Sequence, residues 1–334
     1  MKPSRFFLLA LLLTSFYAVA QSAPHYRQVN KFVLGGSGGW DDLLYDADSD
    51  RLFITRGTRV LVVDPSTGKQ VGEILANGAH GVALVHDKNR GFISNGRTGT
   101  VTVFDLTTLK PTGEVKVGDN PDAIIYDPHS KHVLVMNGRS HNMMAIDPDS
   151  LKVVADIPLG GKLESAAADA GHIYVNVEDT SEISVVDSNS WKETQRWKLA
   201  DCEDPSGLAI DSGARRLFDV CGNKKMVVVD TANGKVVATL PTGGGTDGAG
   251  FDPGLKLAFA SNGEGTLSVV QAAKGDYKLL EDVPTMRSAR TMALDPKLHR
   301  VFLVGAELIP PPAGQRWPTE KPDTFTVLVY APWK

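Results

Sequence analysis

The sequence repeats a short pattern at intervals of about 40 residues, and this period constrains the fold more than any other feature. In each of seven successive stretches an apolar run ends in Asp, and a tight turn and a β-rich stretch follow. Consecutive members of the series are 40 to 43 residues apart. The series is Asp46, Asp87, Asp127, Asp169, Asp211, Asp252 and Asp295. A period of this length, with several short strands in each unit, is typical of a β-propeller in which each unit forms one blade.

Each unit contains enough strand-like segments for a complete blade. The second unit has Val-rich or apolar runs at residues 82–85, 91–94, 101–104 and 113–117, separated by turn residues. β-Branched side chains pack well on a pleated sheet, and Asp, Asn, Gly and Pro favour the turns between strands. A second marker closes the third run of each unit. It is Asp64, Asp105, Asp147, Asp187 or Asp230, with Gln271 and Tyr330 in the last two units. The pattern predicts four antiparallel strands per blade.

The last unit contains only three of these runs. The stretch Tyr26–Leu34 resembles the outermost strand of the other units and can supply the missing one. Pairing it in the last blade closes the ring and removes an open sheet edge. We therefore expect an all-β, seven-bladed propeller that forms a single domain over residues 21–334. A Pro-rich insert at 306–323 interrupts the last blade between its second and third strands.

The first 20 residues have the pattern of a secretory signal peptide. Lys2 and Arg5 precede an apolar run, and cleavage is expected near Ala20. The apolar run is short for a membrane span, and no later run is long enough. Removing these two of 35 basic residues leaves 33 against 39 acidic ones, so the mature chain is acidic. We expect a periplasmic or secreted monomer with no general attraction to nucleic acid or anionic lipid.

Two cysteines, Cys202 and Cys221, are the only ones in the chain. The first precedes the first strand of the fifth unit and the second follows its second strand. An antiparallel hairpin brings these two ends together, and an even number of cysteines in an exported protein favours pairing. The sequence predicts a disulfide. The alternative of a redox-active pair lacks the Cys-x-x-Cys spacing.

The units resemble those of the YVTN-repeat, or YncE-like, seven-bladed propellers of bacteria. Matching segments are Pro121–Pro128, Val133–Gly138, Ile183–Asp187 and Val228–Lys235. The resemblance covers nearly all of residues 26–334. It implies the seven-bladed fold, and it leaves the function open because propellers of this kind have many functions. Binding of single-stranded DNA is one function that the resemblance suggests.

In a propeller, the residues that precede each innermost strand gather around one mouth of the central channel. Counting back five positions from each repeated Asp gives Asp41, Asp122, Glu164, Ser206, Asp247 and Arg290, while a shortened turn places His80 there in the second unit. Asp42 adds a further carboxylate. Carboxylates crowded at one mouth repel one another unless a cation lies between them. These residues predict a site for a cation or a basic ligand, with Asp122, Glu164 and Asp247 as metal ligands. The alternative is that they cap loop backbone groups.

The loops between the second and third strands carry basic residues. Arg56, Arg97 and Arg139 occupy these loops in the first three units and could form a basic loop cluster for an anionic ligand or a nucleic-acid backbone. Binding of single strands also requires aromatic stacking platforms, and none alternates with these arginines. Solvated surface charge is the alternative interpretation, and the sequence favours it.

The sequence contains no nucleophile motif, no phosphate-binding loop and no Cys-x-x-Cys-His motif for covalent haem attachment. We expect a binding or scaffold module whose channel-mouth face binds an unidentified small molecule, peptide or protein. A metal-dependent hydrolase resembling the six-bladed lactonases is the alternative, and single-stranded DNA binding is a third. The cofactor is unidentified, and a divalent cation is the one that the acidic positions suggest.

Overall fold

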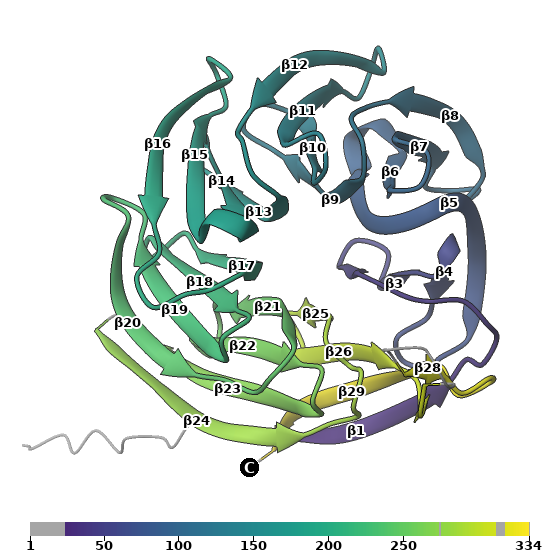
Figure 1. Cartoon of the computed structure of the whole chain (residues 1–334). Coiled ribbons are helices and arrows are strands. Elements are labelled where there is room, and N and C mark those ends of the chain that lie inside the picture. The colour runs from purple at the N-terminus through teal and green to yellow at the C-terminus, as the bar shows by residue number, and fades with distance from the viewer. Residues whose placement is uncertain (1–23, 274, 312–317, 334) are drawn as a thin grey trace, which may run out of the picture.

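A computed structural model describes residues 24–273, 275–311 and 318–333 of the chain. The predicted signal peptide and residues 312–317 of the Pro-rich insert lie outside these ranges. Twisted antiparallel sheets are arranged around a common centre, as in a β-propeller (Figure 1). The described helical segments are two single 3₁₀ turns, η1 (His86–Lys88) and η2 (Glu178–Thr180). Within the described ranges, no helix has the length and apolar character needed to span a bilayer.

In the sheets formed by β2 to β24, neighbouring strands are also consecutive in the chain. The first sheet contains β2 (Leu43–Asp46), β3 (Arg51–Thr55), β4 (Gly57–Val63), β5 (Gln70–Val85), β6 (Arg90–Asn95), β7 (Thr100–Asp105) and β8 (Pro111–Lys116). The next two contain β9 (Pro121–Asp127), β10 (His132–Asn137), β11 (Asn142–Asp147) and β12 (Lys152–Pro158), then β13 (Leu163–Asp169), β14 (His172–Val177), β15 (Glu182–Asp187) and β16 (Lys192–Lys198). Two more contain β17 (Pro205–Asp211), β18 (Arg216–Cys221), β19 (Lys225–Asp230) and β20 (Lys235–Pro241), then β21 (Thr246–Asp252), β22 (Leu257–Asn262), β23 (Thr266–Ala273) and β24 (Asp276–Pro284).

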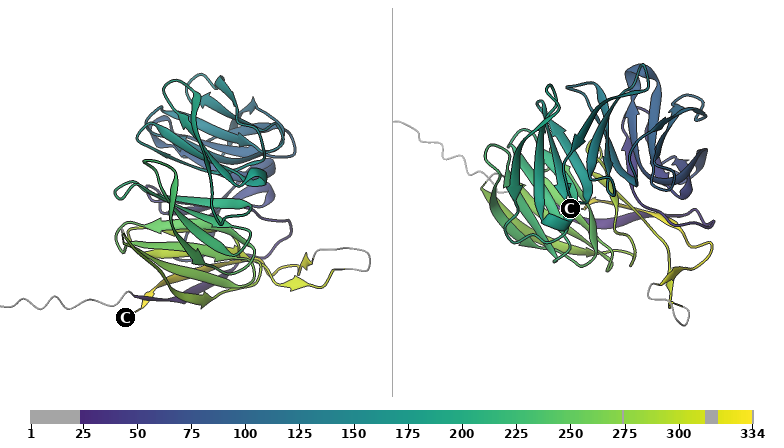
Figure 2. Two further views of the ribbon diagram at one scale, coloured as in Figure 1. Left: turned by 60° about the vertical axis from the view of Figure 1, so that its left-hand side comes forward. Right: turned by 45° about the horizontal axis from the view of Figure 1, so that its top comes forward.

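One sheet joins the two ends of the chain. Its order is β1 (His25–Val33), β29 (Thr326–Trp333), β26 (Arg300–Gly305) and β25 (Met292–Asp295). β1 pairs antiparallel with β29, from His25 opposite Trp333 to Val33 opposite Thr326. The Pro-rich insert contributes the short pair β27 (Leu308–Ile309) and β28 (Thr319–Glu320), which stands out from the sheets (Figure 2).

The hydrophobic core lies between the faces of neighbouring sheets. Leu52 and Ile54 of the first sheet pack in one cluster with Phe302 and Val327 of the sheet that holds both chain ends. The second strand of a sheet is covered on both faces, so every residue of β18 and β22 is buried. The outer strands alternate buried or half-buried and exposed positions, because only one of their faces meets a neighbour. This packing fixes the innermost strands around the centre.

The Asp residues that mark the repeat stabilise turns. Asp64 Oδ1 accepts backbone hydrogen bonds from Ser66 at 2.8 Å and Thr67 at 3.0 Å, and these bonds lower the pKa of the Asp64 carboxyl. In the inner turns, the fully buried carboxylate of Asp252 accepts bonds from the backbone of Gly254 and Leu255. The repeated Asp therefore has a structural role in the turns, and candidate functional residues lie at other positions.

The second unit departs from the pattern at its inner turn. Asp127 ends β9 and pairs with His132, but in the second unit Val85 takes this place and pairs with Arg90. Asp87 lies instead inside η1. Its innermost strand therefore ends at Val85, two residues before Asp87. Counting back five residues from this strand end, and not from Asp87, gives His80.

The predicted disulfide between Cys202 and Cys221 is confirmed. The two Cα atoms are 5.4 Å apart, and the bond closes a segment with a sequence separation of 19. Cys221 ends β18 and pairs with Pro205 at the start of β17, so the hairpin brings Cys202 alongside it.

Candidate functional site at the channel mouth

The strand register places the predicted mouth residues at equivalent positions. Asp122 follows Pro121, which pairs with Asn137, and Asp247 follows Thr246, which pairs with Asn262. His80 follows Ala79, which pairs with Asn95 in the same way. Residues far apart in the sequence therefore meet at one end of the central channel.

Polar side chains of the neighbouring second strands hold the backbone at this mouth. The Ser94 hydroxyl donates to the carbonyl oxygen of Asp122, and the Ser261 hydroxyl donates to that of Arg290. The Asn176 amide donates to the carbonyl oxygen of Ser206 at 3.1 Å. Each bond joins one sheet to the next. These three residues were not predicted from the sequence, although each is the fifth residue of its strand, in β6, β14 and β22.

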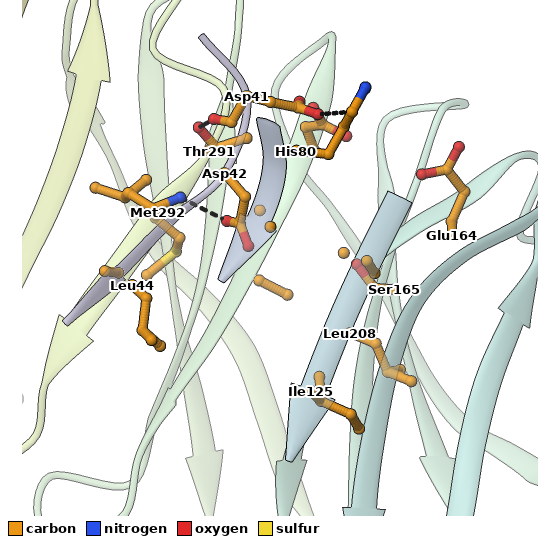
Figure 3. A pocket seen from close by; sticks show the side chains of 18 of the residues that line it. Asp41, Asp42, Leu44, His80, Ile125, Glu164, Ser165, Leu208, Thr291 and Met292 are labelled. Atoms are coloured by element: carbon orange, nitrogen blue, oxygen red, sulfur yellow. Dashed lines mark hydrogen bonds and ion pairs between the residues drawn. The ribbon is translucent and has the colours of Figure 1, made fainter. Parts of the chain in front are cut away.

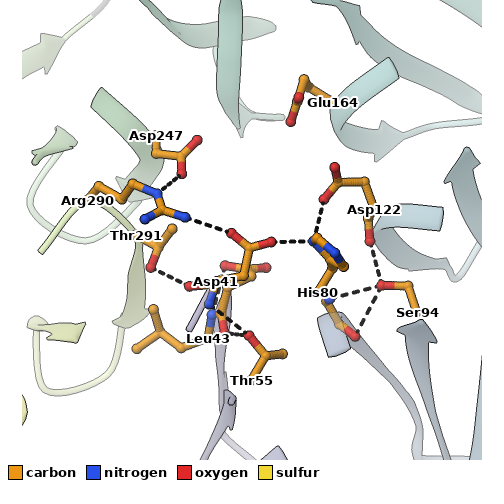
Figure 4. A network of polar contacts seen from close by, with 12 residues as sticks. Asp41, Leu43, Thr55, His80, Ser94, Asp122, Glu164, Asp247, Arg290 and Thr291 are labelled. Carbon is orange, nitrogen blue, oxygen red and sulfur yellow. Dashed lines mark hydrogen bonds and ion pairs between the residues drawn. The ribbon is translucent and has the colours of Figure 1, made fainter. Parts of the chain in front are cut away.

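Three carboxylates and two basic side chains form a continuous chain of ion pairs (Figure 4). Arg290 Nε lies 2.6 Å from Asp247 Oδ2, and its Nη2 lies 3.2 Å from Asp41 Oδ1. His80 Nδ1 lies 2.5 Å from Asp41 Oδ2 and 3.3 Å from Asp122 Oδ1. Asp41 thus bridges the two basic groups. All five side chains are partly exposed, so they are open to a ligand in the channel.

The carboxylates determine the protonation of this network. Hydrogen bonds with Asp122 and Asp41 raise the pKa of His80 to about 10, so the imidazole is charged at neutral pH. Burial raises the pKa of Asp247, although the adjacent Arg290 opposes this effect. Asp42 faces the channel, where protein replaces much of the bulk water. This burial, followed by repulsion from Asp41, raises the pKa of Asp42 to about 7.

Glu164 lies across the opening from this network (Figure 4). Its Oε1 is 2.5 Å from Lys162 Nζ, and Lys162 also contacts the Glu178 carboxylate. Burial raises the pKa of Glu164. The sequence analysis missed Lys162 and Glu178 as members of the mouth, although Lys162 is only two residues from Glu164.

Below the ring of charges the channel becomes apolar. A cavity of about 270 Å³ extends inward from Asp41, Asp122 and Glu164. Figure 3 shows aliphatic side chains along its wall, and these are Leu44, Ile125, Leu208 and Met292. A wider vestibule of about 380 Å³ lies outside the same carboxylates and is also lined by Trp40, Arg97 and Arg290.

The prediction that Arg56 belongs to an exposed basic cluster is wrong. Its side chain is fully buried, its guanidinium carbon lies 3.8 Å from the centre of the Phe325 ring, and its Nη1 lies 3.5 Å from Glu320 Oε2. The insert covers this loop because β28 places Glu320 beside it. Arg97 and Arg139 are exposed, and Arg97 lines the vestibule. The structure therefore does not form the three-arginine groove that the nucleic-acid interpretation requires.

Comparison with known proteins gives the chain a family. The family model of the cytochrome d1 heme domain matches residues 48–249, which is more than half of the chain. The chain belongs to the cytochrome d1 heme domain family. No curated protein sequence matches it. Among solved structures, hydrazine synthase from Kuenenia stuttgartiensis is similar to this member of the family with a TM-score of 0.69 and 18% identity, over 87% of this chain and 95% of that one. At this identity the likeness shows the propeller fold alone.

The residues of this chain do not fit a haem at the channel. A haem carries carboxylate groups, and the channel presents five carboxylates at its mouth, namely Asp41, Asp42, Asp122, Glu164 and Asp247. The one histidine among the described lining residues, His80, holds its Nδ1 between two of these carboxylates. A channel of about 270 Å³ is also at the lower limit for drug-sized ligands, and a haem is larger than those.

Proposed function

We propose that this protein is an exported, YncE-like propeller that acts as a binding module and takes a cationic ligand at its channel mouth. We count seven blades in this proposal, because β5 runs through two of them and divides the sheet β2–β8 into β2–β5 and β5–β8. The pairing of β1 with β29 then supplies the fourth strand of the last blade and closes the ring. The disulfide and the signal-peptide pattern support export to the periplasm or beyond.

The crowding of carboxyl groups at the mouth is the observation that supports cation binding, because a cation favours the ionised form of Asp42 and Glu164, whose pKa values the site raises. Five carboxyl groups line the mouth, those of Asp41, Asp42, Asp122, Glu164 and Asp247. Three basic side chains, His80, Lys162 and Arg290, oppose them. A concave site with low-dielectric walls concentrates the field of such charges and attracts ions of opposite sign. Burial and, after it, repulsion from Asp41 raise the pKa of Asp42, and a bound cation would oppose both effects.

A metal-dependent hydrolase is the second candidate function. It is favoured by one observation, the ligand atoms of Asp41, His80 and Asp122, which all lie within 4.8 Å of one another. The sequence analysis grouped Asp122 with Glu164 and Asp247, but Glu164 pairs with Lys162 and Asp247 pairs with Arg290. A divalent ion at Asp41, His80 and Asp122 would supply Lewis-acid chemistry.

Thermal unfolding in the presence of different cations tests the proposal. The panel comprises Ca²⁺, Mn²⁺, Zn²⁺, methylammonium and guanidinium. A ligand present at 100 times its Kd stabilises a protein by about 2.7 kcal/mol. We expect at least one cation to raise Tm by ~5 °C in the wild type.

The response must depend on the mouth carboxylates. Asp122→Asn should weaken binding by about 10-fold to 150-fold, the effect of losing one contact to a charged group. Glu114→Gln removes an exposed carboxylate on β8, far from the channel, and should behave like wild type. Equal responses of the two variants, or no response to any cation, would contradict the proposal.

A further inference from the structure

The channel combines a charged lining with an apolar lining, and a simple metal ion would interact only with the charged one. Its mouth is a ring of carboxylates, and its wall below the ring is aliphatic (Figure 3). Leu44, Ile125 and Leu208 belong to three different sheets and line the same cavity. A hydrated inorganic ion gains nothing from this wall, whereas a ligand with an apolar body does.

The charges at the mouth are not equally available to a ligand. Asp41, Asp122 and Asp247 already hold His80 and Arg290. Asp42 makes no ion pair within the described part of the chain, and the ion pair of Glu164 is with the half-exposed Lys162. Asp42 and Glu164 both line the cavity where the ring meets the aliphatic wall. A cationic head group at this level has carboxylate partners and leaves its apolar body in the channel.

Glycines let the innermost strands approach one another closely at this level. Gly81, Gly207 and Gly248 line the cavity just below the ring, at the same position of three innermost strands. A Cβ atom on Gly207 would lie 2.5 Å from the backbone oxygen of Asp247. The strands approach one another too closely for side chains there, so backbone lines the channel between the ring of carboxylates and the aliphatic wall.

From this lining we infer that the channel takes a slender organic cation, a primary ammonium or guanidinium group on an unbranched aliphatic chain. The inference rests on the proposed cation-binding function and names the class of ligand. The head group lies between Asp42 and Glu164, and the chain extends along Leu44, Ile125 and Leu208. A cavity of about 270 Å³ holds roughly nine water volumes, which suits a chain of about six carbons.

The same lining rejects a haem, the cofactor in the name of the family. The acidic ring repels the carboxylates of a haem, and the inner channel of about 270 Å³ is small for a macrocycle. The inference therefore separates this chain from a haem-binding function, although the fold is shared.

Calorimetric titration with matched ligands tests the inference. The probes are hexylammonium, methylammonium, hexan-1-ol, hexanoate, Mn²⁺ and haemin. Each buried methylene strengthens binding about fourfold. Hexylammonium should therefore bind at least about 100-fold more tightly than methylammonium, and hexan-1-ol, hexanoate and haemin should not bind measurably.

Two variants divide the site into its parts. Ser165→Leu fills the channel below the ring without changing a charge, and it should weaken hexylammonium binding while leaving methylammonium unchanged. The double variant Asp42→Asn, Glu164→Gln should weaken both amines by at least tenfold, and Glu114→Gln should weaken neither. Thermal unfolding of each variant establishes that it is folded.

Different failures have different meanings. Equal affinity for the two amines, or binding of Mn²⁺ alone, overturns the inference and leaves the proposed function standing. Binding of hexan-1-ol as tight as that of hexylammonium, or haemin binding with a shifted Soret band, overturns the inference too. If none of the cations binds, both the inference and the proposed function fail.

Discussion

His80 should remain protonated well above neutral pH because two carboxylates stabilise its charged form. Each carboxylate can be replaced separately to test this. Contacts with Asp122 and Asp41 raise its pKa from 6.5 to about 10. Because one pH unit corresponds to 1.36 kcal/mol, the surroundings favour the imidazolium by roughly 5 kcal/mol, a net value because burial opposes the two carboxylates. The ring is 30% exposed, so solvent screening reduces the part of this energy that a variant reports. Asp122→Asn or Asp41→Asn should each lower the pKa of His80 by about 1 to 2.

The double variant, in which both carboxylates are amides, gives the strongest contrast. Burial then acts alone and lowers the pKa of His80 below 6.5. The assay is NMR titration of the His80 ring, with a His80→Gln variant to assign the signals. A wild-type His80 that titrates near 6.5, or single variants that leave the pKa unchanged, would refute the ion-pair network on which the mouth is built.

The same shift has a consequence for stability. A folded-state pKa above the unfolded value stabilises the fold at low pH. The contribution of His80 is fully present below about pH 6.5 and is lost as pH rises toward 10. Denaturant unfolding at pH 6 and pH 10 should show a larger loss for the wild type than for His80→Gln. Equal losses would show that the ring does not carry this energy.

Three further predictions concern the fold that supports the site. The Cys202→Ala, Cys221→Ala variant should lose about 3 kcal/mol, the value for a loop of about 20 residues, and its Tm should fall by ~6 °C; an unchanged Tm would contradict the stabilising role of this bond. Glu320→Gln leaves the buried Arg56 without its carboxylate and should cost about 1–3 kcal/mol in denaturant unfolding, whereas the exposed Glu114→Gln should cost almost nothing. Gly207→Ala forces a Cβ against backbone atoms of β21 and should cost about 1–3 kcal/mol, and a stable variant would show that these strands can separate.

Much of the fold could be predicted from the sequence, because the repeat contains the Asp residues that stabilise its turns. Asp64 and Asp252 bind the backbone of the residues that follow them, and this local geometry recurs in each unit. Counting back from the repeated Asp also located Asp41, Asp122 and Asp247, because a fixed strand length separates turn and mouth. The pairing of distant cysteines followed from the hairpin in the same way.

Features outside the period were not predictable by counting. The insert places Glu320 beside Arg56, and the insert is not part of the repeat. The repeat alone therefore gives no reason to expect that Arg56 is buried. Lys162 and Glu178 reach Glu164 from the loops of their own sheet, so their role depends on side-chain directions and not on spacing. The sequence likewise does not predict which carboxylates pair with a basic side chain and which are available to a ligand, because this depends on side-chain contacts in the folded protein.

The central claim is that carboxylates from separate sheets act together as one cation site on the axis. Calorimetric titration of hexylammonium into the wild type and into the Asp42→Asn, Glu164→Gln variant tests it most directly, since Asp42 precedes β2, Glu164 lies on β13, and the two line the same channel mouth. We expect saturable 1:1 binding to the wild type and a loss of at least tenfold in the variant. Equal affinity in the two proteins would contradict it.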